Sequence, residues 1–329
     1  METQDDIAGW LARQAQVDRK TRDFGRSAAQ SAERPTLSDL FPEAVFDASG
    51  CVMLEHRSPI KPCFPTPEAA LAAVRSETRL LYGIGARHSS RLHEEGYTSL
   101  DALLDHPRWR DAAAALLERW GTPPAPNRVY ETLARWLPAS SPLFLAMLGL
   151  IAPNDAIFFD LETLGLGGAP IFLGAVGRFS DGSFVVRQYL APSPAEEVSV
   201  LERMTEEIAG ARALVSFNGK AFDATMLRER CAYYGLPFVE APIHVDLLHA
   251  ARQAFVGRIP DCRLGTIERS ILGIEREGDL PSEQVPFYYT LFLETGSATV
   301  LEPIIRHNRQ DLISLAYLAA DLLRRADVD

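Results

Sequence analysis

The sequence has few cysteines, no excess of positive charge and no long hydrophobic run. Its 329 residues include four cysteines, and no two of them form a Cys-x-x-Cys pair, which argues against a zinc ribbon. Scattered thiols are typical of proteins in a reducing compartment. The longest apolar run, residues 142–153, is too short to span a bilayer, and the acidic N-terminus lacks a signal-peptide pattern. We therefore expect a cytoplasmic protein without a membrane partner.

The charge balance restricts how this protein can contact nucleic acid. The formal net charge is -11, which is unfavourable for a protein that coats nucleic acid. It does not exclude binding of a single end through metal ions and a local basic patch. The apolar fraction of 47% is ordinary for a globular protein, and the length is sufficient for two domains with a substantial core.

Proline, glycine and hydrophobic patterning predict four segments. We expect a mobile or loosely packed segment at 1–40, a small mainly helical domain at 41–121, a Pro-rich linker with connecting helices at 122–152, and a larger domain at 153–329. The first segment is alternatively a basic arm that contacts nucleic acid. A small hairpin is expected around residues 47–50.

The larger domain is predicted to be α/β. Strands at 157–162, 171–179 and 184–190 form a meander. A helix at 195–209, a strand at 213–217, a helix at 221–233 and a strand at 243–246 follow, and the remainder is mainly helical to about residue 325. This order predicts a mixed sheet flanked by helices.

Within the small domain, residues 79–105 resemble a helix-hairpin-helix, a module that binds DNA phosphates without reading sequence. Gly83 and Gly85 permit a tight turn, and amides at the following helix N-terminus can hold a phosphate. Arg87 adds positive charge there. The alternative is two packed helices with no ligand, and such motifs also mediate protein contacts.

A short apolar run leads into Asp160 and Glu162. Side chains two residues apart in a strand share a face, so both carboxylates project together. Carboxylates this close repel one another unless a cation lies between them, and a hard divalent cation fits. Many Asp-x-Glu pairs bind no metal, so interpreting this pair as a metal site requires further motifs elsewhere in the chain.

Two further short motifs contain acidic residues. Asn218 lies at a strand-to-helix junction, and Asp223 lies early in the helix, where the helix dipole alone also favours a carboxylate. Lys220 either contacts a phosphate or is solvated. On the final helix, His307 and Asp311 are four residues apart and share a face, which is either part of a site or an ordinary polar face.

These three motifs, in this order, resemble the exonuclease motifs of the DEDD (DnaQ-like) superfamily, which has a ribonuclease-H-like fold. The likeness is greatest to the YprB-type branch of predicted exonucleases and covers about residues 156–323. It also rests on residues 187–189, 217–220, 246–249, 264–269 and 307–311. The helix-hairpin-helix stretch and residues 40–42 resemble what that branch carries upstream.

The resemblance implies specific roles. Asp160, Glu162, Asp223 and Asp311 would bind two Mg²⁺ or Mn²⁺ ions, which suits their oxygen ligands and in-line phosphodiester cleavage. His307 would orient or deprotonate the attacking water. Its spacing departs from the family, because a histidine here has the spacing of the tyrosine subclass. Leu164 is placed either to wedge against the terminal base or in the core.

The sequence therefore predicts a metal-dependent 3'-5' exonuclease acting on single-stranded or frayed nucleic acid. The alternatives are a structure-specific endonuclease on the same fold and a catalytically silent nucleic-acid-binding or scaffold protein. DNA and RNA are not distinguished. Arg258, Arg263 and Arg269 line a nucleic-acid path or are solvated surface.

Overall fold

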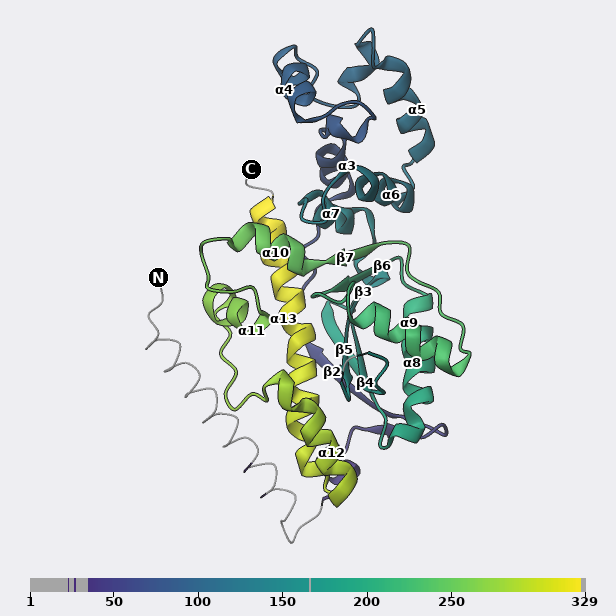
Figure 1. The fold of residues 1–329 in the computed structure, drawn as a ribbon, viewed down its shortest axis with the longest axis vertical. Helices are drawn as coiled ribbons and strands as arrows, with labels where there is room; N and C mark the ends of the chain where they lie inside the picture. Colours follow the sequence, from purple (N-terminus) through teal and green to yellow (C-terminus); the bar gives the residue numbers. More distant parts are fainter. Residues whose placement is uncertain (1–22, 24–26, 28–34, 166, 327–329) are drawn as a thin grey trace.

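A mixed β-sheet forms the centre of the molecule (Figure 1). The computed structural model describes residues 23, 27, 35–165 and 167–326. In this part of the chain the sheet has seven strands in the order β1-β2-β5-β4-β3-β6-β7. The strands are β1 (Val45–Phe46), β2 (Val52–Ser58), β3 (Ala156–Thr163), β4 (Ile171–Ser180), β5 (Ser183–Leu190), β6 (Ala213–Ser216) and β7 (His244–Asp246). Strands β3, β4 and β5 form the expected antiparallel meander, and β6 and β7 continue the sheet in parallel.

Helices cover both faces of the sheet, which confirms the predicted α/β class (Figure 1). Helices α8 (Glu197–Ala209) and α9 (Asp223–Tyr234) pack on one face. The other face carries α10 (Leu247–Phe255), α11 (Leu264–Ile267), α12 (Val285–Thr295) and the long α13 (Glu302–Ala326). None of the described helices has the length and hydrophobicity that a membrane crossing needs.

The alternation of side chains along β3 decides which face carries the acids. Ile157 and Phe159 are buried in the cluster that includes α8 and α9. Phe158 is buried in the cluster that includes residues of α13. Because successive strand residues point to opposite faces, Asp160 and Glu162 share the face of Phe158. The two carboxylates therefore share one face, as the period-two argument predicted, and that face is covered by α13.

A helical region occupies one end of the elongated molecule (Figure 1). It contains α3 (Pro67–Arg75), α4 (Ala86–Glu94), α5 (Arg110–Trp120), α6 (Pro126–Trp136) and α7 (Leu143–Ala146). Trp120 is fully buried, and its indole Nε1 donates to Thr132 Oγ1 over 3.0 Å, which joins α5 to α6. The core of this region is continuous with the core under α13.

The structure differs from the sequence expectations in two places. The hairpin β1–β2 forms where expected, but β2 pairs along its whole length with β5 and so extends the main sheet, although it was assigned to the small domain. The helix expected before the glycine turn is only one 3-10 turn, Thr78–Leu80. Most of the segment 1–40, including any basic arm, lies outside the described residues; α2 (Leu37–Leu40) is its described helix.

Candidate active site

Acidic residues from three distant parts of the chain meet beside β3. Asp160 and Glu162 come from the end of β3, Asp223 begins α9, and Asp311 lies in the first half of α13. The mutual charge of these carboxylates contributes to raising the pKa of Asp160. The structure therefore brings together the four carboxylates that the motifs singled out.

Glu162, His307 and Asp311 lie close enough together to share one metal ion. One ligand atom from each lies within 4.8 Å of the others. His307 Nε2 lies 3.5 Å from Asp311 Oδ2, because residues four apart on a helix are neighbours. Two carboxylates and one imidazole in this arrangement fit a divalent cation.

Asp160 is held by an amide network. Asn308 Nδ2 donates to Asp160 Oδ2 over 2.7 Å. Gln188 of β5 donates from Nε2 to Asn308 Oδ1 over 2.8 Å and also to the carbonyl of Ile305. Asn308 and Gln188 are both buried, so this chain of hydrogen bonds fixes the orientation of one Asp160 oxygen.

The turn between β6 and α9 places Asp223. Asn218 adopts a left-handed conformation with φ of 64°, which asparagine tolerates better than most residues. Asp246 accepts hydrogen bonds from the amides of Asn218 (2.7 Å), Lys220 (3.1 Å) and Leu248 (3.1 Å). Asp246 thus orders this turn and also caps α10, so one side chain links the two elements.

A largely buried arginine, Arg276, and an aspartate, Asp279, also contact His307 and Asp311. Arg276 forms ion pairs with Glu268, Asp279 and Asp311. Asp279 Oδ1 accepts from His307 Nδ1 over 2.9 Å. Neither residue was singled out from the sequence, because the segment that contains them is rich in charge and glycine and resembles a solvated loop.

Burial and crowding shift the protonation equilibria of the acids. Burial raises the pKa of Glu162 to about 8, and the charges of Asp311 and Asp223 add to this effect. Burial likewise raises the pKa of Asp223 to about 7. The pKa of Asp160 is raised well above its ordinary value by burial and by the neighbouring carboxylates. Such a cluster favours a bound cation, because positive charge offsets the repulsion.

The pKa of His307 is raised, whereas burial alone lowers the pKa of a histidine. Burial lowers its pKa, but the hydrogen bond to Asp279 and the charges of Asp311 and Glu162 together raise the pKa to about 9. At neutral pH and without a bound cation, the ring is therefore an imidazolium. In this state both ring nitrogens are donors.

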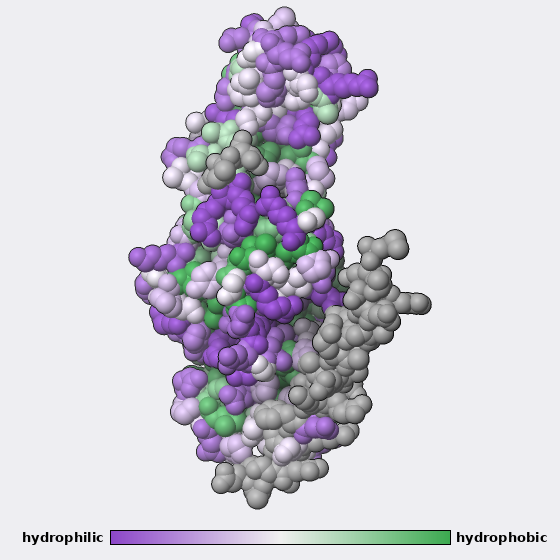
Figure 2. All heavy atoms as spheres, turned by 90° about the vertical axis from the view of Figure 1, so that its left-hand side faces the viewer, coloured by the Kyte–Doolittle hydropathy of each residue, from purple (hydrophilic) through white to green (hydrophobic). Residues whose placement is uncertain are grey.

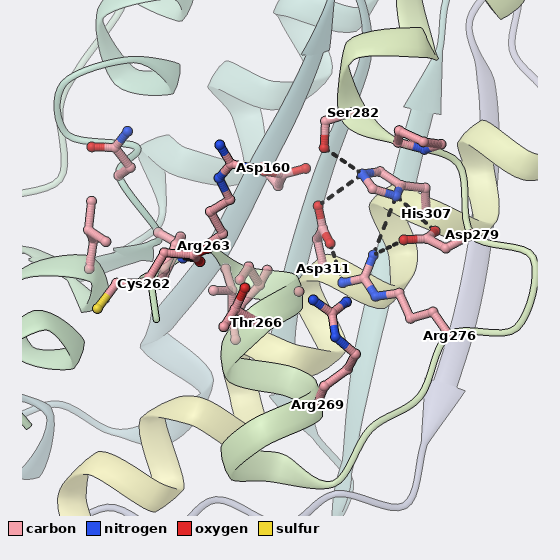
Figure 3. A pocket seen from close by; sticks show the side chains of 18 of the residues that line it. Asp160, Cys262, Arg263, Thr266, Arg269, Arg276, Asp279, Ser282, His307 and Asp311 are labelled. Atoms are coloured by element: carbon pink, nitrogen blue, oxygen red, sulfur yellow. Dashed lines mark hydrogen bonds and ion pairs between the residues drawn. The ribbon is translucent and has the colours of Figure 1, made fainter. Parts of the chain in front are cut away.

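The group opens into a cavity of about 740 Å³ (Figure 3). Asp160, His307 and Asp311 line one part of it, and Figure 3 shows them with Asp279 and Arg276 converging on one space. Asn218 also lines the cavity. A volume in the ~300–1,000 Å³ range is typical of ligand-binding clefts.

Other candidate residues lie elsewhere. Lys220 Nζ donates to the Tyr130 hydroxyl over 2.8 Å and is outside the cavity lining. Leu164 is half-buried and packs against the cluster that contains Phe172, outside the lining.

The helix-hairpin-helix residues are also separate from the carboxylates. All three belong to the helical region at the end of the molecule (Figure 1): Gly83, with φ of 90°, Gly85, which is the N-cap of α4, and the exposed Arg87. Their phosphate-binding role stays a prediction.

Comparison with known proteins agrees with this architecture. A family model described as RNase_H superfamily matches residues 157–323. The uncharacterized protein YprB of Bacillus subtilis (strain 168) is 35% identical over 175 residues, which are 50% of this chain and 41% of YprB. The match thus spans less than half the length of that relative.

A solved structure is also similar in part. The family B DNA polymerase from the hyperthermophilic archaeon Pyrobaculum calidifontis aligns with a TM-score of 0.41 and 18% identity, over 52% of this chain and 25% of the polymerase. The family match covers β3 to β7 and every acidic residue described above. The chain belongs to the RNase H superfamily, whose nucleases act on nucleic acid and generally use divalent metal ions.

Proposed function

We propose that this protein is a metal-dependent 3'-5' exonuclease that hydrolyses phosphodiester bonds at single-stranded or frayed ends. The observation that carries the proposal is the convergence of Asp160, Glu162, Asp223 and Asp311 beside β3, where Asp160 and Asp311 line a cavity. The order of their motifs and the RNase H superfamily membership support the choice of reaction.

The carboxylates of Asp160, Glu162, Asp223 and Asp311 would hold two Mg²⁺ or Mn²⁺ ions. When bound, such ions supply activation of the attacking water and stabilisation of the leaving oxygen. The amide network through Asn308 orients Asp160 for this task. The Asp246 turn sets the start of α9 and thereby Asp223.

His307 is suited to orienting a ligand rather than to accepting a proton. Asp279 holds Nδ1, and Nε2 faces Asp311 and Ser282. A ring whose pKa is raised to about 9 is a weak candidate for a general base at neutral pH. We therefore assign His307 to orientation, the first of the two roles implied by the resemblance.

The test uses purified protein with Mn²⁺ and matched single-stranded DNA and RNA that carry a 5' label. We expect a ladder that shortens from the 3' end and that Asp160→Asn and Asp223→Asn abolish. Asp181→Asn is the matched control, because Asp181 lies in the exposed β4–β5 turn at φ of 49°, which asparagine accepts.

Three results would contradict the proposal. Internal cleavage of a strand with a blocked 3' end would indicate the endonuclease alternative. Near-normal activity in either acid variant would show that the site is wrongly assigned. Absence of Mg²⁺ or Mn²⁺ binding at millimolar concentrations would favour a silent scaffold.

A further inference from the structure

Arginines line the part of the cavity that adjoins the carboxylates. Arg252 comes from α10, Arg263 precedes α11, and Arg269 follows it. Figure 3 shows Arg263 and Arg269 extending from the α11 segment into the space that Asp160 and Asp311 face. The cavity therefore has an acidic end and a basic wall.

The three arginines differ from Arg276 in their partners. The Nη1 and Nη2 atoms of Arg276 form ion pairs with Glu268, Asp279 and Asp311. In the described part of the chain, the guanidinium groups of Arg252, Arg263 and Arg269 make no ion pair and no hydrogen bond, and all three side chains are exposed. The charges of Arg263 and Arg269 act on the nearby carboxylate of Asp261 without forming an ion pair with it. Arginines without ion pairs concentrated in one cavity are notable in a chain with a net charge of -11.

The remaining lining suits a ligand that is charged along one side and flat or apolar along the other. Phe217, Leu248 and Leu264 line the same cavity. Figure 2, which shows this side of the molecule, has mostly hydrophilic side chains near the level of α10 and α11, with a smaller hydrophobic area among them. The carboxylate of Asp261 also lies on the wall, where it accepts a hydrogen bond from the Arg263 amide over 3.0 Å.

We propose that Arg252, Arg263 and Arg269 bind successive backbone phosphates of the strand whose end reaches the carboxylates. Guanidinium groups pair with phosphate through two parallel hydrogen bonds, and apolar surface beside them accommodates sugars and bases of any sequence. This assignment rests on the proposed nuclease function, and it adds that the enzyme holds several nucleotides of one strand rather than a terminal nucleotide alone.

A binding assay with a catalytically inactive variant tests the phosphate-binding role of these arginines directly. The probe is a 5'-fluorescein single strand of about 12 nucleotides, titrated by anisotropy into Asp160→Asn protein with Mg²⁺. Adding Arg263→Gln and Arg269→Gln together is expected to weaken binding about tenfold or more and to lower the salt slope by about 0.7 per lost phosphate contact. Arg258→Gln is the matched control, because Arg258 is exposed on the same connecting segment but does not line the cavity.

Equal affinity and salt slope in the double variant and in Arg258→Gln would overturn the proposal. Because the substituted arginines are exposed, circular dichroism and Tm are expected to match those of Asp160→Asn alone, which shows that the variants fold.

Cleavage assays separate this proposal from the proposed function. They use protein that keeps the native Asp160 and carries only the arginine substitutions. The double variant is expected to raise KM for a long strand about tenfold with kcat within about twofold, and to lose preference for that strand over a dinucleotide. Cleavage with unchanged KM would contradict the phosphate-binding role of the arginines but not the exonuclease activity. Arginine-dependent binding without any cleavage would contradict the exonuclease activity but not the strand-binding role of the arginines.

Discussion

Asn308 donates a hydrogen bond to Asp160 across the boundary between α13 and the sheet, over 2.7 Å. The amide cannot rotate freely, because Gln188 donates to its oxygen from β5. One buried acid of the candidate site is thus oriented by two neutral amides, which stabilise its charged form without adding net charge. The pKa of Asp160 is still raised, since burial and three neighbouring carboxylates outweigh this hydrogen bond.

Removing this amide should destabilise the protein. Asn308→Ala leaves Asp160 and Gln188 without their shared partner, and an unsatisfied buried polar group costs about 1–3 kcal/mol. Urea unfolding of cation-free protein measures the difference. Arg324→Ala, on the exposed end of the same helix, is the control. A loss no greater than that of the control would mean that the network does not stabilise the fold.

Divalent cations should stabilise the protein more as pH rises. The folded-state pKa values of Glu162 and Asp223, about 8 and about 7, lie above their unfolded values. Their contribution to stability is therefore present below about pH 4 and is lost as pH rises through 7 and 8. Bound cations offset the resulting repulsion, so the rise in Tm with Mn²⁺ is expected to be larger at pH 8 than at pH 5.5.

The matched control for this prediction is Glu162→Gln with Asp223→Asn. A Tm rise that is independent of pH, or that persists in the double variant, would place the cation elsewhere. Calorimetry in buffers of different ionisation enthalpy provides a second readout, because the raised pKa values require proton release when a cation binds near pH 7.

Asp279→Asn should lower the pKa of His307. The hydrogen bond to Asp279 and its charge help to raise that pKa to about 9, whereas burial acts against them. NMR titration of the histidine ring measures the change. Because the folded pKa is raised, the pair stabilises the protein below about pH 6.5, and this advantage of the wild type disappears as pH rises through 9. An unchanged His307 pKa would show that Asp279 does not control it.

Gly219→Ala should disturb the placement of Asp223. A Cβ at Gly219 would lie 2.6 Å from Ser216 Cβ and 2.9 Å from Asp223 Oδ2, so the turn has to shift. Overpacking of this kind costs about 1–3 kcal/mol, and a displaced carboxylate should reduce nuclease activity at least tenfold. At Gly210 an added Cβ meets nothing within 4 Å, so Gly210→Ala is the control. Full activity in Gly219→Ala would show that this turn does not position Asp223 for the reaction.

Local patterns in the sequence were sufficient for the parts of the site that lie on regular elements. The period of two in β3 correctly placed Asp160 and Glu162 on one face. The helical spacing correctly placed His307 beside Asp311.

The parts that were missed depend on contacts between distant segments. Arg276 and Asp279 follow a π-helical turn, Glu268–Leu272, in a stretch with no hydrophobic period. No local pattern therefore indicates that their side chains contact the candidate site. Gln188 is separated by 120 residues from the amide that it orients. The pairing of β2 with β5 is similarly non-local, so no local pattern indicates that the hairpin extends the main sheet.

That pairing has a practical consequence for producing the nuclease domain by itself. The family match begins at residue 157, yet β5 obtains its outer hydrogen-bonding partner from residues 52–58. Glu55 also pairs with Arg187 across this seam at 3.0 Å. A fragment cut at the family boundary would expose the amides and carbonyls of β5, and an exposed strand edge invites pairing with other copies. The unit that folds and the unit that is recognised by homology therefore differ in extent, and a soluble fragment has to retain the hairpin.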